Sequence, residues 1–299
     1  METSKNISYF KGNKETKVDD YFIKNEMAQF LQLDNLNFLV GAGCSSNIVD
    51  GTELGIPGMA SLYSGFFAKY PNFEIAGQPV EKIFDGNLEK MLETMGAILV
   101  ANQVSEIDSD IEGKMLIVQQ YIREQIIAGL HGKEVLDFYH NFYMKTVSRG
   151  RKTPVNIFTT NYDIYNEQAL DMLAFPYNNG FIGTYNRVFN PASYKYAYVE
   201  DMNLSKDVWE RVPNFYNLYK LHGSITWVKK DNQIREVDYN HIADKDTVMI
   251  YPTPLKDRTT LMTPYSDLFR AMETALLRKN SVLITLGYSF SDDHINRLI

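Results

Sequence analysis

The sequence predicts an α/β protein with a doubly wound, mainly parallel sheet and a helical insertion. Short apolar runs of β-favouring residues alternate with stretches of helical periodicity, which is the pattern of βαβ units. Four of these runs end in glycine or polar residues. Parallel sheets bind ligands beyond the carboxyl ends of their strands. We therefore expect the four strand ends to form one site.

Composition limits the class of protein. The 299 residues are 44% hydrophobic and 22% charged, which suits one large folded domain or a core with an insertion. A net charge of −7 disfavours broad binding to nucleic acid. The single cysteine, Cys44, excludes an internal disulfide and paired-cysteine zinc sites. Neither a signal peptide nor a membrane-spanning run is evident in the sequence, so we expect a cytoplasmic protein.

The order of elements follows from the apolar spacing. The first strand, residues 37–40, comes after a helical stretch at 21–32 and ends at a glycine turn. Helical spacing then dominates, as at Leu88, Met91, Leu92 and Met95. Further strands are expected at 155–158, 218–228, 247–251 and 281–290, with a helix at 264–278.

These elements predict a Rossmann-like core with two insertions. The core comprises residues 30–60, 151–175 and 218–299. Residues 61–150 form a helical insertion. Residues 176–217, rich in Tyr, Asn and Pro, form a loop-rich one.

The first strand end carries glycines suited to a phosphate. Gly41, Ala42 and Gly43 allow close backbone approach, and Ser45 with the N–H groups of a following helix would supply donors. The pattern lacks the third glycine of GxGxxG and the GK[ST] of a P-loop. By itself it is equally compatible with a structural turn.

The second and third strand ends carry the candidate catalytic groups. Asn161 and Asp163 lie two residues apart, close enough to bind a ribose, a carboxamide and a water together, although Asn and Asp also cap helices. His222 is a candidate general base or a structural histidine. At the fourth end, Gly287 and Ser289 lack the second glycine of a nucleophile elbow, which disfavours an esterase.

Five motifs in order resemble the sirtuin-like superfamily. They are GAGCSSN (41–47), GIP (55–57), TTNYD (159–163), KLHGS (220–224) and GYSFSDDHIN (287–296). The later pattern YPTPLK (251–256) and PYSDLF (264–269) resembles more closely the sirtuin-like NADase domains of prokaryotic antiphage defence systems. The likeness spans about residues 30 to 299.

The departures from the superfamily are informative. Its protein deacylases carry a four-cysteine zinc ribbon between the HG motif and the late glycine motif, and this sequence has no cysteine there. Their GIPDFR stretch reads GIPGMA at 55–60, without the Asp or the Arg. Both departures disfavour a deacylase.

The resemblance implies cleavage of the nicotinamide–ribose bond of NAD+ through an oxocarbenium-like transition state, without a metal. Asn161 would hold the ribose and the attacking water, His222 would act as general base, and Asp163 would bind the carboxamide or orient Asn161. The remaining predicted contacts are with the dinucleotide. They involve Gly41, Ala42, Gly43, Ser45, Thr160, Gly287, Ser289 and Asp292.

The sequence therefore predicts an NAD+ glycohydrolase that depletes NAD+ as the effector of an abortive-infection system. The resemblance implies control by homo-oligomer assembly, by a further C-terminal domain, by a HerA-type ATPase or by a phage protein. A longer native protein is expected. Two alternatives stay open. One is an NAD-dependent deacylase or ADP-ribosyltransferase, and the other is a sensor that binds NAD or ADP-ribose without turnover.

Overall fold

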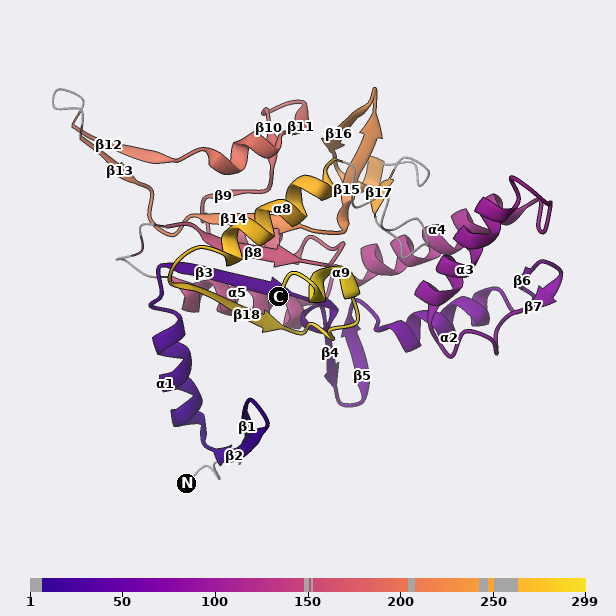
Figure 1. The fold of residues 1–299 in the computed structure, drawn as a ribbon, viewed down its shortest axis with the longest axis horizontal. Coiled ribbons are helices and arrows are strands. Elements are labelled where there is room, and N and C mark those ends of the chain that lie inside the picture. Colours follow the sequence, from indigo (N-terminus) through magenta and orange to yellow (C-terminus); the bar gives the residue numbers. More distant parts are fainter. Residues whose placement is uncertain (1–6, 148–150, 152, 204–207, 242–246, 250–262) are drawn as a thin grey trace.

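A parallel sheet of five strands forms the centre of the computed structural model (Figure 1), which describes residues 7–147, 151, 153–203, 208–241, 247–249 and 263–299. In spatial order the strands are β18 (Ser281–Leu286), β3 (Asn35–Val40), β8 (Val155–Thr159), β14 (Tyr216–Lys220) and β9 (Tyr177–Asn178). Every neighbouring pair is parallel. The result is a mixed α/β fold consistent with the predicted Rossmann-like class.

Helices pack against both faces of this sheet. On one face, Phe38, Ile157 and Leu218 share a core with helices α5 (Lys133–Thr146) and α6 (Tyr165–Met172). On the other face, Leu39, Phe158 and Tyr219 pack with helix α8 (Tyr265–Leu276). The three inner strands are almost wholly buried, which explains why they read as continuous apolar runs rather than as alternating ones.

A row of buried asparagines crosses the sheet on the α8 side. Asn37, Asn156 and Asn217 are register partners on adjacent strands. Asn156 Nδ2 donates to Asn37 Oδ1 at 2.8 Å, and Asn217 Nδ2 donates to Asn156 Oδ1 at 3.2 Å. A one-residue slip would place these amides against the apolar face, so the row fixes the register of the three strands.

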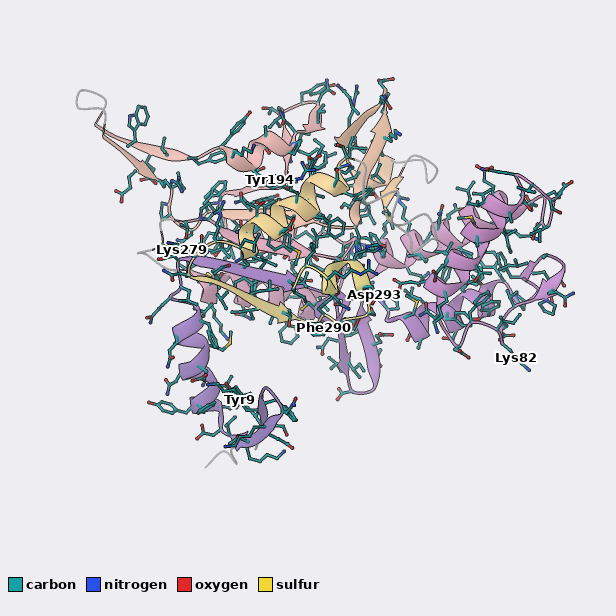
Figure 2. The ribbon with its side chains drawn as sticks, viewed as in Figure 1. Tyr9, Lys82, Tyr194, Lys279, Phe290 and Asp293 are labelled. Atoms are coloured by element: carbon teal, nitrogen blue, oxygen red, sulfur yellow. The ribbon has the colours of Figure 1, made fainter. Side chains whose placement is uncertain are left out.

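The helical stretch between β3 and β8 contains α2 (Met59–Lys69), α3 (Leu88–Ala101), α4 (Ile111–Gly129) and α5, with a short hairpin of β6 (Glu74–Ile75) and β7 (Gln78–Pro79). Its far end projects from the sheet, on the right in Figure 1, and Lys82 marks that end in Figure 2. Phe66 is fully buried among Phe67, Tyr70, Phe73 and Tyr121.

A second, antiparallel sheet was not anticipated. In spatial order its strands are β10 (Phe181–Ile182), β11 (Arg187–Phe189), β16 (Gln233–Glu236), β15 (Gly223–Lys230) and β17 (Thr247–Met249). Trp227, on β15, is fully buried. Strands β15, β16 and β17 lie in the stretch that the sequence assigned to the Rossmann-like core, but they belong to this second sheet and not to the parallel one. The strand predicted at 218–228 divides at His222 into β14 and β15.

The remaining elements are peripheral hairpins and turns. A hairpin of β1 (Ile7–Lys11) and β2 (Lys14–Val18) precedes α1 (Asp20–Phe30), and β12 (Val199–Asn203) pairs with β13 (Val208–Arg211) in an extended arm (Figure 1). Short 3₁₀ turns cover Pro191–Lys195 and Tyr239–His241. Within the described residues, each helix is too short or too polar to span a bilayer.

The asparagine row predicts a stability effect. Asn156→Ala leaves the partner groups of Asn37 and Asn217 buried and unsatisfied, so we expect the free energy of unfolding to fall by about 2–4 kcal/mol. Replacing all three asparagines by Val should recover part of that loss, because the three amides are removed together, although Ser281 Oγ and Val282 O lose a donor from Asn37. Urea unfolding of both variants measures this. A triple variant less stable than Asn156→Ala would contradict the register role.

Candidate functional site

Two loops meet at the carboxyl ends of β3 and β18. Gly41 N donates to Leu286 O and Gly43 N donates to Gly287 O, both at 2.9 Å. A Cβ on Gly41 would lie 2.6 Å from Gly287 O, and one on Gly287, where φ is +57°, would lie 2.5 Å from Cys44 N. These glycines therefore have a structural role, because a side chain at either position would prevent the contact between the two loops.

The glycine turn does not open a helix, contrary to the sequence prediction. It forms a 3₁₀ turn over Ala42–Cys44, followed by a hairpin of β4 (Ser46–Val49) and β5 (Thr52–Gly55). The next helix, α2, begins only at Met59. The predicted helix N–H donors therefore do not lie directly after the turn. Ala42 and Gly43 are exposed and offer backbone groups alone.

Ser45 is the centre of a buried hydrogen-bond network. Its Oγ lies 2.7 Å from Asp163 Oδ2, 2.9 Å from Asn161 Nδ2 and 2.9 Å from the Tyr139 hydroxyl. A serine hydroxyl has one proton to donate and two lone pairs, and these three partners use all of them. In this arrangement the hydroxyl has no hydrogen-bonding capacity left, so the predicted contact of Ser45 with the pyrophosphate would require one of these bonds to break.

The Asn161 side chain has one chemically possible orientation. Its amide nitrogen lies 3.0 Å from Gly41 O, and a carbonyl can only accept, so the N–H group must face it. The amide oxygen is buried and has no hydrogen-bond partner among the described residues. An unsatisfied buried acceptor calls for a ligand or a water, as expected of a residue that holds a substrate hydroxyl.

Asp163 is buried beside Asn161. Burial raises the pKa of this carboxyl, whereas Lys220, the Ser45 hydroxyl and the N–H of Tyr165 oppose the rise. Its Oδ1 accepts from Tyr165 N at 3.0 Å, at the start of α6. Asp163 thus contacts both the start of α6 and the network, but it precedes the N-cap residue, Ile164, so it does not cap this helix.

Lys220 is a site residue that sequence reasoning missed. Its ammonium group is fully buried, donates to the backbone carbonyl of Asp163 and lies 3.0 Å from Glu167 Oε1. The sequence signal that could have identified Lys220 is a lysine within a predicted core strand, where charged residues are rare. It fixes the turn that carries Asn161 and Asp163.

His222 lies at the carboxyl end of β14 and faces Asp292. Its Nε2 is 2.9 Å from Asp292 Oδ2, which is the distance of an ion pair but without the directional geometry of a hydrogen bond. Asp292 Oδ1 also accepts from His294 N and caps α9 (Asp293–Asn296). Asp292 was predicted on the adenosine side of the dinucleotide. The structure places it against the predicted base instead.

The other predicted contacts lie nearer the surface of the same edge. Gly287 and Ser289 are exposed, and Ser289 Oγ lies 2.8 Å from Ser291 Oγ. Thr160 is half-buried and its N–H donates to Val40 O at 3.2 Å. Phe290, labelled with Asp293 in Figure 2, has φ of +57° in this loop. The structure thus brings all predicted residues to one sheet edge, where the three predicted catalytic residues, Asn161, Asp163 and His222, are buried.

A cavity of about 340 Å³ adjoins the glycine turn. It is lined by Val40, Gly43, Cys44, Ser46, Asn47, Phe138, Tyr139, Phe142 and Leu286. Burial raises the pKa of the Cys44 thiol to about 11, so the group stays neutral and is a poor nucleophile at physiological pH.

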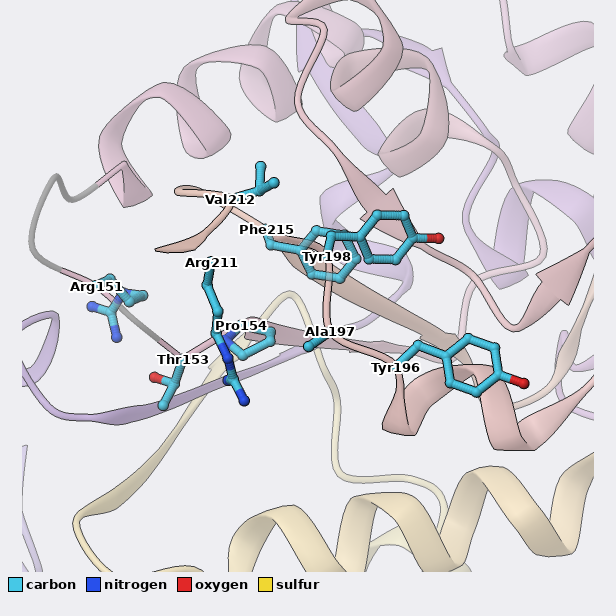
Figure 3. A pocket seen from close by; sticks show the side chains of 9 residues that line it. All are labelled: Arg151, Thr153, Pro154, Tyr196, Ala197, Tyr198, Arg211, Val212 and Phe215. Carbon is cyan, nitrogen blue, oxygen red and sulfur yellow. The ribbon is translucent and has the colours of Figure 1, made fainter. Parts of the chain in front are cut away.

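Another hollow lies at the opposite, amino-terminal ends of β8 and β14, between Pro154 and Phe215 (Figure 3). Its volume of about 30 Å³ is close to that of a single water. The carboxyl edge therefore remains the candidate site.

The comparison with known families supports this location. Residues 155–299 match a SIR2-like domain. The match includes Asn161, His222 and Gly287, while the glycine turn and Ser45 precede it. None of the curated proteins compared with the chain matches it. A SIR2-like domain implies NAD+ binding and an NAD-related function in general.

The contact between the two loops predicts a stability effect. Gly287→Ala introduces a Cβ against Cys44 N at positive φ, so we expect the free energy of unfolding to fall by about 2–5 kcal/mol. Gly86 has φ of +74° but open space around it. Gly86→Ala should cost only about 1–2 kcal/mol. Equal losses in denaturant unfolding would argue against the loop contact.

Proposed function

We propose that this chain is an NAD+ glycohydrolase that releases nicotinamide and ADP-ribose. The observation that carries the proposal is the Asn161 amide, whose nitrogen is fixed by Gly41 and Ser45 and whose buried oxygen has no partner among the described residues. Such an oxygen can accept a hydrogen bond from a ribose hydroxyl or from a water. A fixed acceptor at a SIR2-like strand end suits attack on a ribose carbon.

The reaction requires a leaving group, an acceptor and a base. The C1′–N bond breaks with its electron pair moving to the nicotinamide ring nitrogen, and the ribose develops oxocarbenium character. A water held by Asn161 bonds to C1′ and loses its proton toward His222. Asp163 keeps the Asn161 turn in place through Ser45. The chemistry needs no covalent enzyme intermediate.

Hydrolysis is favoured over deacylation by the groups around the site. The GIP stretch is anchored by the N–H of Ile56, which donates to Ser45 O at 2.8 Å, but it lacks the Asp and Arg of the deacylases. The sequence also has no cysteines for the zinc ribbon that accompanies peptide binding in those enzymes. A dinucleotide site is retained without features for an acyl-lysine peptide.

The biological role in the proposal is depletion of NAD+ by the effector of an abortive-infection antiphage system. A lethal hydrolase must be inactive in healthy cells. Assembly into a homo-oligomer, a further domain, a HerA-type ATPase and a phage protein are the candidate activators carried over from the resemblance. The contact of His222 with Asp292 fits a resting state, since a base that faces a carboxylate is engaged.

The second candidate is a sensor that binds NAD or ADP-ribose without turnover, in which the contact between His222 and Asp292 would be structural. A sensor would need Asn161 and the glycine turn, but not a base. Tight binding of NAD+ by calorimetry with no nicotinamide released, in any assembly state and with any activator, would favour the sensor over the hydrolase.

The proposal predicts loss of turnover in two variants. A positioned base contributes about 10²–10⁴-fold, so we expect Asn161→Ala and His222→Ala to lower nicotinamide release by at least about 10²-fold. His140→Ala, a half-buried histidine on α5, is the matched control and should retain activity. Chromatography of NAD+ products at low and high protein concentration measures this. Undiminished release from either site variant would contradict its assigned role.

A further inference from the structure

We propose that Tyr139, on helix α5, is a positioning residue of this site: its buried hydroxyl holds Ser45, and through Ser45 the amide of Asn161, in a single hydrogen-bonded arrangement. The hydroxyl lies 2.9 Å from Ser45 Oγ and 3.5 Å from Asn161 Nδ2. The expected effect of Tyr139 on turnover rests on the proposed hydrolase function. The hydrogen-bonded arrangement of Tyr139, Ser45 and Asn161 does not depend on that function.

The direction of each hydrogen bond follows from counting protons. Ser45 has one hydroxyl proton, and the carboxylate oxygen of Asp163 at 2.7 Å accepts it. Asn161 Nδ2 can only donate to Ser45. The Tyr139 hydroxyl must therefore donate to the remaining lone pair of Ser45. Burial next to Asp163 raises the pKa of Tyr139 well above its usual value, so this donor keeps its proton at assay pH.

Tyr139 is itself held firmly. Its side chain is buried, with 4% of the residue exposed, and its ring stacks on Tyr165 with centroids 5.5 Å apart and an interplanar angle of 14°. The Tyr165 hydroxyl donates to Gly129 O at 2.5 Å, at the end of α4. The donor is thus fixed by two helices before the substrate arrives, as a preorganised site requires.

Without this hydroxyl, one acceptor position of Ser45 is empty and buried. The serine is then held by two partners instead of three, and it is the partner that restrains one N–H of the Asn161 amide. The amide oxygen that would hold the attacking water becomes less well directed. We therefore expect a defect in the chemical step rather than in substrate binding.

The same helix provides a matched control. Tyr143 lies one turn further along α5, is fully buried and donates to Asn166 Oδ1 at 2.7 Å. Tyr139→Phe and Tyr143→Phe each delete one buried, hydrogen-bonded hydroxyl from α5. Only the first hydroxyl contacts the Ser45 network. A merely structural role predicts the same effect of both changes.

The kinetic experiment compares the two variants with the wild type. One well-placed hydrogen bond changes a rate by about 3- to 10-fold, so Tyr139→Phe should lower kcat by that factor with KM within about 2-fold. Tyr143→Phe should leave both constants unchanged. Equal kcat losses in the two variants, or a rise in KM without loss of kcat, would overturn the proposal.

A second readout is independent of how much enzyme is folded. An added pyridine base can replace water: its ring nitrogen bonds to C1′ as nicotinamide leaves, which gives an exchanged dinucleotide. If Tyr139 positions the water through Asn161, Tyr139→Phe should raise the ratio of exchange to hydrolysis by about 3- to 10-fold, and Tyr143→Phe should not. An unchanged ratio in Tyr139→Phe would contradict water positioning.

A double-mutant cycle separates this inference from the proposed function, because it measures unfolding and needs no turnover. Tyr139→Phe and Asn161→Ala should have non-additive effects on the free energy of unfolding, whereas Tyr143→Phe and Asn161→Ala should be additive. Additivity in the first pair would overturn the proposal. A wild type that never cleaves NAD+ but shows coupling would refute the hydrolase and retain the Tyr139 network.

Discussion

The contacts of Ser45 determine the arrangement of the whole carboxyl edge of the sheet. Its hydroxyl joins α5 to the turn after β8, and its backbone carbonyl accepts from Ile56 N and approaches Gly55. A Cβ on Gly55 would lie 2.4 Å from Ser45 O, so only glycine permits this approach. Three segments that are far apart in sequence are thus joined at one residue.

Burying charge beside this residue opposes folding. Burial raises the pKa of both Asp163 and Glu167, and Lys220 only partly offsets it. One oxygen of Glu167 and the amide oxygen of Asn161 remain buried without a hydrogen-bond partner in the described part of the chain. Buried ion pairs contribute little net stability. The concentration of buried charged groups at one strand end is typical of a functional site rather than of a stabilising core.

The sequence predicted the sheet better than the site. Continuous apolar runs identified β3, β8, β14 and β18, and in the three inner strands this composition follows from burial on both faces. The end of each strand was likewise marked by glycine or polar residues. Asp163 accepts from the backbone at the start of α6 and also contacts the network, and the sequence had no means to show that one side chain does both.

Other features could not be read from local pattern. The second sheet pairs short strands whose partners lie up to 49 residues apart, as Arg187 and Glu236 do, so neither periodicity nor turn residues identify it. The strand predicted at 247–251 is described only at Thr247–Met249, and the YPTPLK motif at 251–256 lies outside the described residues. Nothing in the sequence indicated that Tyr139 belongs to the site, because a tyrosine at an apolar position of a helix ordinarily packs in the hydrophobic core.

The chemistry of the site also explains why it belongs to the whole chain rather than to the SIR2-like match alone. Residues 155–299 provide Asn161, Asp163 and His222. Residues that precede the match fix how these groups point. Gly41 and Ser45 determine which end of the Asn161 amide faces the protein, and the amide oxygen is the end left without a partner among the described residues. A fragment limited to the matched region would keep the proposed catalytic side chains and lose the groups that orient Asn161.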